Sequence, residues 1–193
     1  HVYILKETGE IVDNCQKRPQ RLFEERELSV DECAGYLQKA INLLKSQTAA
    51  SGSSEGTLKV IITVSPIRYA KYGYHGSQLS KATLLLAADK LVKENPGVVS
   101  YFPAYEIMND ELRDYRFYKE DMLHPSEQAV EYIWERFRAT YFGKAAEQFL
   151  EDWRPIREAL GHKPFHPESE EHQKFIARTE EKKRQFEEKY HLL

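Results

Sequence analysis

Two short runs rich in β-branched residues, joined by a helical pattern, limit the folds open to this chain. Residues 58–66 form the first run, which a Ser-Pro pair ends, and residues 98–103 form the second. Short, continuously apolar runs are typical of strands buried in a parallel sheet. Between them, a helix is predicted to begin at Ser80 and to end at Asn-Pro-Gly, residues 95–97. Its inner face would carry the apolar residues Leu84, Leu85, Ala88, Leu91 and Val92. The order strand–helix–strand predicts an α/β fold with a parallel sheet and a right-handed crossover.

Hairpin, helix and loop patterns fill the rest of the first half. Apolar residues around a turn signal predict a β-hairpin over residues 2–12. Ser29, with a glutamate three residues later, is typical of a capped helix start. That helix would bury one apolar stripe: Tyr36, Leu37, Ala40, Ile41 and Leu44. Residues 47–57 and 67–79 are predicted to be loops.

The last third of the chain is predicted to be helical. An apolar pattern predicts one helix that begins at Pro125, and residues 144–160 continue with a second. The charged run at 168–190 predicts a solvated helix supported by ion pairs four residues apart. We therefore expect an α/β domain over residues 1–142 and a helical extension over residues 143–193.

Charge, apolar content and metal-ligand spacing exclude several classes of function. The formal net charge is −3 and no block of Lys and Arg is present, so no nucleic-acid partner is expected. No apolar run reaches the roughly 18 residues of a membrane span. Cys15 and Cys33 form no Cys-x-x-Cys pair, and Pro164 breaks the helix that would bring His162 and His166 together. No metal site is therefore expected.

The two cysteines and the start of the chain lead to two weaker expectations. Two free thiols fit a reducing compartment, so we expect a cytoplasmic location, although a disulfide between Cys15 and Cys33 stays open. The chain starts at His1 inside a strand-like run, with no initiator Met and no signal peptide. We expect a domain that is incomplete at its N-terminus, with its own missing N-terminal segment as one partner.

Asp121 and His124 are the pair of residues best suited to acid–base chemistry. They follow the second buried run, and reactive groups gather at the carboxyl ends of parallel strands. An Asp three residues before a His can place its carboxylate on the imidazole Nδ1–H, which leaves Nε2 free to take a proton. The alternative is that both residues merely cap the helix at Pro125. The short motif alone does not decide between them.

Five segments form one long combined motif. They are Thr63-Val64-Ser65-Pro66-Ile67-Arg68, Gln78-Leu79-Ser80-Lys81-Ala82, Tyr101-Phe102-Pro103-Ala104-Tyr105-Glu106-Ile107, Leu112-Arg113-Asp114-Tyr115-Arg116-Phe117-Tyr118 and Asp121-Met122-Leu123-His124-Pro125-Ser126. In content, order and spacing, residues 1–141 resemble the GSCFA domain family.

The resemblance implies a three-layer α/β/α fold with a parallel sheet, the SGNH (GDSL-like) hydrolase architecture related to flavodoxin. It implies a serine hydrolase, an esterase or deacylase, acting on an O-acyl ester of a small molecule or glycan without a cofactor. Asp121 and His124 match the triad Asp and His of that superfamily. The Gly-Ser-Cys-Phe-Ala segment that would supply the nucleophile is absent, so the serine is expected upstream. The alternative is a non-catalytic α/β binding or scaffold module.

Three further residues are predicted to bind substrate. Ser65 ends a strand, but Pro66 removes the N–H that a nucleophile elbow would use, so lining the cleft suits Ser65 better. Arg68 could hold an anionic group of the substrate. His75 could overhang the site from the loop at 67–79, or be a solvated loop histidine.

Two more arginines share the chemistry of Arg68. Arg113 and Arg116 could also bind an anionic group through two N–H groups each, since a guanidinium matches the geometry of carboxylate and phosphate. Their better-supported alternative is ion pairing with neighbouring acidic residues: Glu106, Asp110, Glu111 and Asp114.

Overall fold

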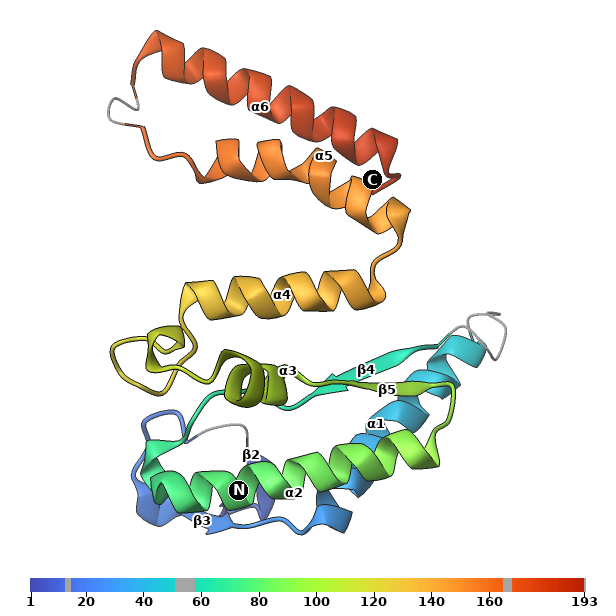
Figure 1. The fold of residues 1–193 in the computed structure, drawn as a ribbon, viewed down its shortest axis with the longest axis vertical. Coiled ribbons are helices and arrows are strands. Elements are labelled where there is room, and N and C mark those ends of the chain that lie inside the picture. The colour runs from blue at the N-terminus through green and yellow to red at the C-terminus, as the bar shows by residue number, and fades with distance from the viewer. Residues whose placement is uncertain (13–14, 51–57, 165–167, 193) are drawn as a thin grey trace. The chain divides into compact units, whose positions relative to one another are not determined.

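A computed structural model describes residues 1–12, 15–50, 58–164 and 168–192 of the chain (Figure 1). The chain divides into two compact units, residues 1–133 and residues 134–193, and each is described by itself.

The first unit opens with a three-stranded antiparallel sheet in the order β2-β1-β3. β1 (Val2–Leu5) and β2 (Glu10–Val12) form the predicted hairpin, with Gly9 at a positive φ in the turn. β3 (Phe23–Arg26) pairs with the other edge of β1 and was not predicted. Its sequence Phe-Glu-Glu-Arg has one buried side chain, that of Phe23, so it carries no apolar pattern.

Helix α1 (Val30–Ala50) begins at the predicted cap, but of the predicted stripe only Ile41 is buried. The Glu32 N–H donates to Ser29 Oγ over 3.2 Å and the Ser29 N–H to Glu32 Oε2 over 2.9 Å, which is a reciprocal capping box. Buried positions of the helix are Ala34 and Ile41. The predicted stripe was wrong at four positions, because these side chains are exposed: Tyr36, Leu37, Ala40 and Leu44. Residues 47–50 continue the helix where a loop was predicted, and residues 51–57 lie outside the described ranges.

The two β-branched runs form a parallel pair, as predicted. β4 (Val60–Thr63) lies beside β5 (Val99–Phe102), with Val60 opposite Val99. The crossover helix is α2 (Gly73–Glu94), which ends before Asn95-Pro96-Gly97 as expected. α1 and α2 pack on this sheet through one core: Ala34, Ile41, Ala87, Leu91 and Val99, with Val60 and Ile62 beside them.

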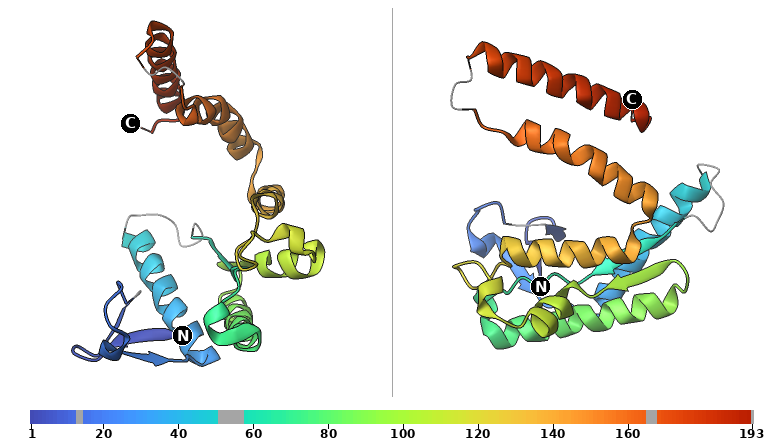
Figure 2. Two further views of the ribbon diagram at one scale, coloured as in Figure 1. Left: turned by 90° about the vertical axis from the view of Figure 1, so that its left-hand side faces the viewer. Right: turned by 45° about the horizontal axis from the view of Figure 1, so that its top comes forward.

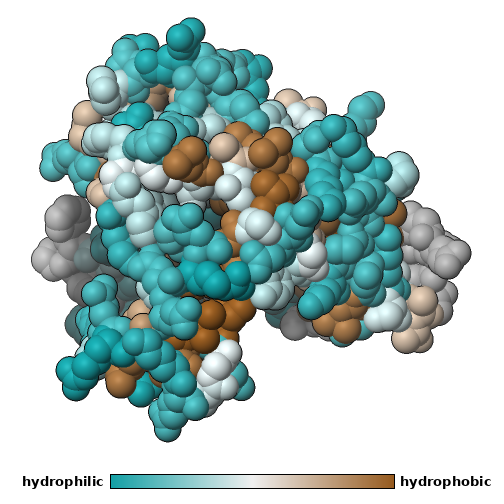
Figure 3. All heavy atoms as spheres, turned by 90° about the horizontal axis from the view of Figure 1, so that it is seen from below, coloured by the Kyte–Doolittle hydropathy of each residue, from teal (hydrophilic) through white to brown (hydrophobic). Residues whose placement is uncertain are grey.

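The start and inner face of α2 differ from the prediction. A 3-10 turn, η2 (Ala70–Tyr72), precedes the helix, which begins at Gly73 rather than Ser80. Gly73 has a φ of 67°, a conformation that glycine adopts without steric cost. Ala88 and Leu91 are buried as predicted, whereas Leu84 is exposed. Exposed apolar side chains of this kind interrupt the hydrophilic surface in patches (Figure 3).

A second core forms after β5. The chain passes through α3 (Ala104–Glu106), a π-helical turn η3 (Ile107–Leu112) and a 3-10 turn η4 (Tyr115–Phe117) before α4 (Glu127–Tyr141). Four buried residues pack together here: Met108, Phe117, Tyr118 and Ala129. The first unit is thus mixed α/β with a parallel sheet, as predicted (Figure 2). The three-layer arrangement belongs to the proposal made below.

The second unit contains the helical pair α5 (Lys144–Gly161) and α6 (Glu170–Lys189), close to the predicted ranges. Phe186 is buried and its ring contacts those of Phe149 and Trp153. Ion pairs one turn apart, such as Glu170 with Lys174, support α6 as expected. Among the helices in the described ranges, none has the length and apolar character that crossing a membrane requires.

Candidate functional site

Asp121 and His124 lie in a closed turn between η4 and α4. The Lys119 N–H donates to the His124 carbonyl over 2.8 Å, and the Ser126 N–H donates to the Phe117 carbonyl over 2.7 Å. Main-chain bonds on both sides therefore hold the base of the turn. At its tip, Met122 takes a φ of 59° and its N–H donates to the Lys119 carbonyl over 2.9 Å.

The Asp121 carboxylate organises this turn with both of its oxygens. Oδ1 accepts the backbone N–H groups of Leu123 and His124 at 2.8 and 3.0 Å. Oδ2 lies 2.5 Å from Nδ1 of His124. The N–H of His124, the N–H of Leu123 and the imidazole, in that order, lower the pKa of Asp121 to about 2. The carboxylate is therefore charged at any physiological pH.

His124 presents its other ring nitrogen to solvent. Its side chain is 53% exposed, and within the described ranges Nε2 has no hydrogen-bond partner. A carboxylate on Nδ1 favours the tautomer whose Nε2 carries a lone pair. The geometry expected for an oriented general base is therefore present.

Asp121 and His124 do not cap the helix that follows them, which was the alternative interpretation of the motif. α4 begins at Glu127, and Ser126 Oγ accepts the Ala129 N–H over 3.3 Å. Ser126 is thus the N-cap, whereas Asp121 caps only its own turn.

The segment after β4 fixes the turn to the rest of the unit. The Arg68 N–H donates to the Leu123 carbonyl over 3.1 Å. The next residue is tied to α2, because the Tyr69 N–H donates to Ser77 Oγ over 3.2 Å. The Asp-His turn therefore lies at the carboxyl end of β4, the edge where a parallel sheet gathers functional groups.

Lys81 belongs to the same support and was not predicted. Its side chain is only 5% exposed, and its Nζ donates to the Ser65 carbonyl over 2.6 Å. In the described part of the chain no carboxylate pairs with it, and burial lowers its pKa. A sequence signal existed, since Lys81 lies seven residues before buried Ala88 and so shares its helix face.

Ser65 lies two residues beyond the end of β4 and makes a local turn. Its side chain is exposed, and its Oγ accepts the Ile67 N–H over a long 3.4 Å. Within the described residues its Oγ makes no hydrogen bond to His124. Ser65 is thus not paired with the candidate base.

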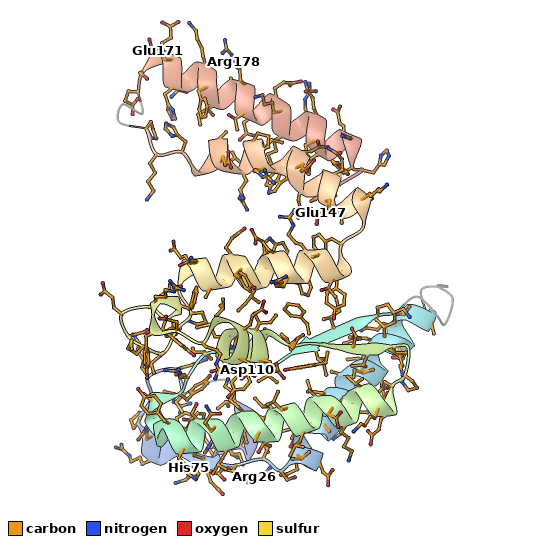
Figure 4. All side chains as sticks on the ribbon, viewed as in Figure 1. Arg26, His75, Asp110, Glu147, Glu171 and Arg178 are labelled. Atoms are coloured by element: carbon orange, nitrogen blue, oxygen red, sulfur yellow. The ribbon has the colours of Figure 1, made fainter. Side chains whose placement is uncertain are left out.

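A hollow of about 190 Å³ adjoins the turn. Its lining comes from the segment after β4 and from the η3–η4 connection: Arg68, Met108, Asn109, Arg113, Asp114, Tyr115 and Tyr118. Arg68 alone, of the three residues predicted to bind substrate, lines it. His75 lies in the first turn of α2 rather than in a loop and is exposed (Figure 4).

The remaining predictions concern ion pairs and metals. Arg116 pairs with Asp114 at 3.9 Å, as the alternative expected, whereas Arg113 has no ion pair in the described ranges. A larger hollow of about 300 Å³ beside Phe23 contains no acid–base pair like that of Asp121 and His124. No group of three metal-ligating side chains converges within the part that the structure describes; His166 lies outside it.

Comparisons with known proteins identify the family to which the chain belongs. No curated protein and no solved structure matches the chain. The model of the GSCFA domain protein, C-terminal domain, matches residues 153–193. The GSCFA family model matches residues 1–137, more than half of the chain and all of the site described above. The chain therefore belongs to the GSCFA family.

Proposed function

We propose that the chain supplies the acid–base part of an SGNH-like serine hydrolase, an esterase or deacylase. The observation that carries this proposal is the Asp121 Oδ2 at 2.5 Å from Nδ1 of His124, with Nε2 open to solvent. A charged carboxylate stabilises the imidazolium that forms when Nε2 accepts a proton. The family membership supports the proposal without assigning an activity.

The proposed reaction uses His124 twice. Nε2 takes the proton of a serine hydroxyl as the oxygen attacks the acyl carbon, and then gives it to the departing alcohol. Water repeats both steps to release the acid. Asp121 keeps the ring oriented throughout and is not itself protonated, in accordance with its low pKa. The proposal takes the serine from a segment outside residues 1–193, in a three-layer SGNH fold.

The proposed substrate is an O-acyl ester of a small molecule or a glycan. Arg68 is proposed to contact it from the hollow beside the turn. Ser65 and His75 are weaker candidates, because neither lines that hollow. The chemistry needs no metal or organic cofactor. Cys15 and Cys33 are free, which supports a cytoplasmic location.

The test uses the full-length protein, an activated acetyl ester and a serine-directed fluorophosphonate. We expect turnover and labelling, and loss of both in His124→Ala. The matched control is His162→Ala, an exposed histidine of the second unit, which should keep both. Equal turnover and labelling in the two variants would remove His124 from the mechanism. No turnover and no labelling in the wild-type protein would favour a non-catalytic binding or scaffold module.

A further inference from the structure

We propose that the hollow lined by Arg68 and Arg113 is a subsite for an oxyanion, a carboxylate or phosphate group carried by the substrate. That the anion is part of a substrate rests on the proposed function, whereas the binding of the anion itself does not. The subsite would make the natural ester anionic at a point away from the bond that is cleaved.

Arg68 is held in place without an acidic partner among the residues that the structure describes. Its guanidinium carbon lies 3.9 Å from the centre of the Tyr118 ring and 6.0 Å from those of Tyr74 and Tyr115. Nη1 lies 3.5 Å from the Met122 carbonyl, the guanidinium's single hydrogen-bond contact among the described residues. Aromatic rings orient a guanidinium by stacking and do not neutralise its charge. Arg68 is therefore a positioned cation with N–H groups left over for a ligand.

Arg113 adds a second cation, which comes from the connection between η3 and η4. It lines the same hollow, and within the described ranges it has no ion pair. Its φ is 50°, a left-handed conformation that favours glycine and is costly for arginine. Strained backbone of this kind clusters at functional sites. Met122, in the Asp-His turn, is strained in the same way.

The local charge balance favours an anion. Asp114 also lines the hollow, but its Oδ2 lies 3.9 Å from Nε of Arg116 and its Oδ1 accepts the Arg116 N–H over 3.0 Å. Arg68 and Arg113 therefore line the hollow together with one carboxylate, and that carboxylate is already paired with Arg116, which is not part of the lining. Two guanidinium groups around a hollow of about 190 Å³ suit one carboxylate or phosphate group.

The subsite and the acid–base pair share a wall. The backbone N–H of Arg68 donates to the Leu123 carbonyl, and Leu123 lies between Asp121 and His124. A ligand held by Arg68 would therefore lie beside the Asp-His turn. This placement links recognition of an anionic group to the reacting end of the same substrate.

The test is a titration of the full-length protein with inorganic phosphate and, separately, with acetate, followed by amide NMR shifts. We expect Arg68→Gln and Arg113→Gln each to weaken binding about tenfold, because each removes one of two cations. Arg113→Gly removes the same charge while relieving the backbone, so it covers the case in which Arg113→Gln folds poorly. The matched control, Arg21→Gln, removes a cation of the same unit outside the hollow and should change binding by less than about twofold.

Two results would overturn the subsite: binding of neither anion by the wild-type protein, or equal losses in Arg21→Gln and the two hollow variants. Which anion binds more tightly separates a phosphate-bearing from a carboxylate-bearing substrate. The titration needs no turnover, so a protein that binds the anion but cleaves no ester keeps the subsite and loses the hydrolase proposal. A protein that cleaves neutral esters but binds no anion keeps the hydrolase proposal and loses the subsite.

Discussion

Replacing Arg113 by glycine should stabilise the protein and weaken its anion binding. Arg113 directly follows η3 as its C-cap residue, with a φ of 50° and a ψ of 19°. Its side chain is exposed, so truncation removes little packing. Its N–H donates to the Met108 carbonyl over 3.3 Å, a bond that glycine keeps. The substitution therefore changes the backbone preference and one charge, with little else.

The expected gain is the difference of two opposing terms. A left-handed conformation costs a residue with a side chain about 1–2 kcal/mol. Glycine adds about 0.5–1 kcal/mol of conformational freedom to the unfolded chain. The free energy of unfolding should thus rise by about 0.5–1 kcal/mol, which raises Tm by about 1–4 °C.

Urea unfolding and thermal melts of three proteins measure this gain. Arg113→Ala is the matched control, because alanine removes the guanidinium but keeps the strained conformation. Arg113→Gly should be the more stable of the two variants, and both should lose anion binding equally. Equal stabilities, or a glycine variant below the alanine variant, would show that the backbone at this position is not strained in solution.

Four further results are expected. Asp121→Asn should move neutral His124 to the Nε2–H tautomer, seen in imidazole ¹⁵N shifts, and lower kcat by roughly 10²–10⁴-fold; an unchanged tautomer would refute the orienting role. Because the folded pKa of Asp121 is about 2 against an ordinary 3.8, its carboxylate stabilises the turn above about pH 4, and this contribution is lost as pH falls through about 2, which a ¹³C carboxyl titration measures; a titration near 4 would contradict it. Leu91→Ala, at the fully buried centre of the first core, should lower the free energy of unfolding by about 2–5 kcal/mol in urea, and a loss below about 1 kcal/mol would argue against that packing. Burial lowers the pKa of Lys81 below its ordinary 10.5, so the unfolded state holds the proton to higher pH and stability should rise with pH toward 10.5; Lys81→Met should flatten that rise, and equal slopes would place Lys81 in solvent.

Elements with a strong local pattern were predictable, and those decided by packing partners were not. The parallel pairing of residues 60–63 with 99–102 follows from two buried runs around a helix. β3 has a polar sequence and exists because β1 offers it a free edge. The buried face of α1 was predicted correctly only at Ile41: Leu37 and Leu44 repeat with helical period but are exposed, and the core that α1 shares with α2 and the sheet takes Ala34 instead. Periodicity identifies a helix but not which neighbour covers it.

The candidate site likewise has a part that the sequence predicts and a part that depends on packing. Asp121 and His124 are three residues apart, so their contact is local and the sequence predicts it. Arg113 and Arg68 lie 45 positions apart, and Lys81 meets Ser65 across a turn and a helix start. Such contacts depend on how the segments after β4 and β5 come together, which no spacing rule supplies. The left-handed backbone at Arg113 also leaves no mark in the sequence, because glycine is absent there.

The Asp-His turn is self-supporting, and this bears on how a hydrolase could use it. Its geometry depends on main-chain bonds within residues 117–126, on the Asp121 carboxylate and on two bonds from Arg68. None of these bonds involves a nucleophile. A base that is oriented before the nucleophile arrives costs no reorganisation when the reaction starts. In the proposed mechanism, a serine brought within hydrogen-bond reach of His124 Nε2 would therefore meet an imidazole that Asp121 has already oriented. The proposed subsite at Arg68 and Arg113 would hold the far end of an anionic ester.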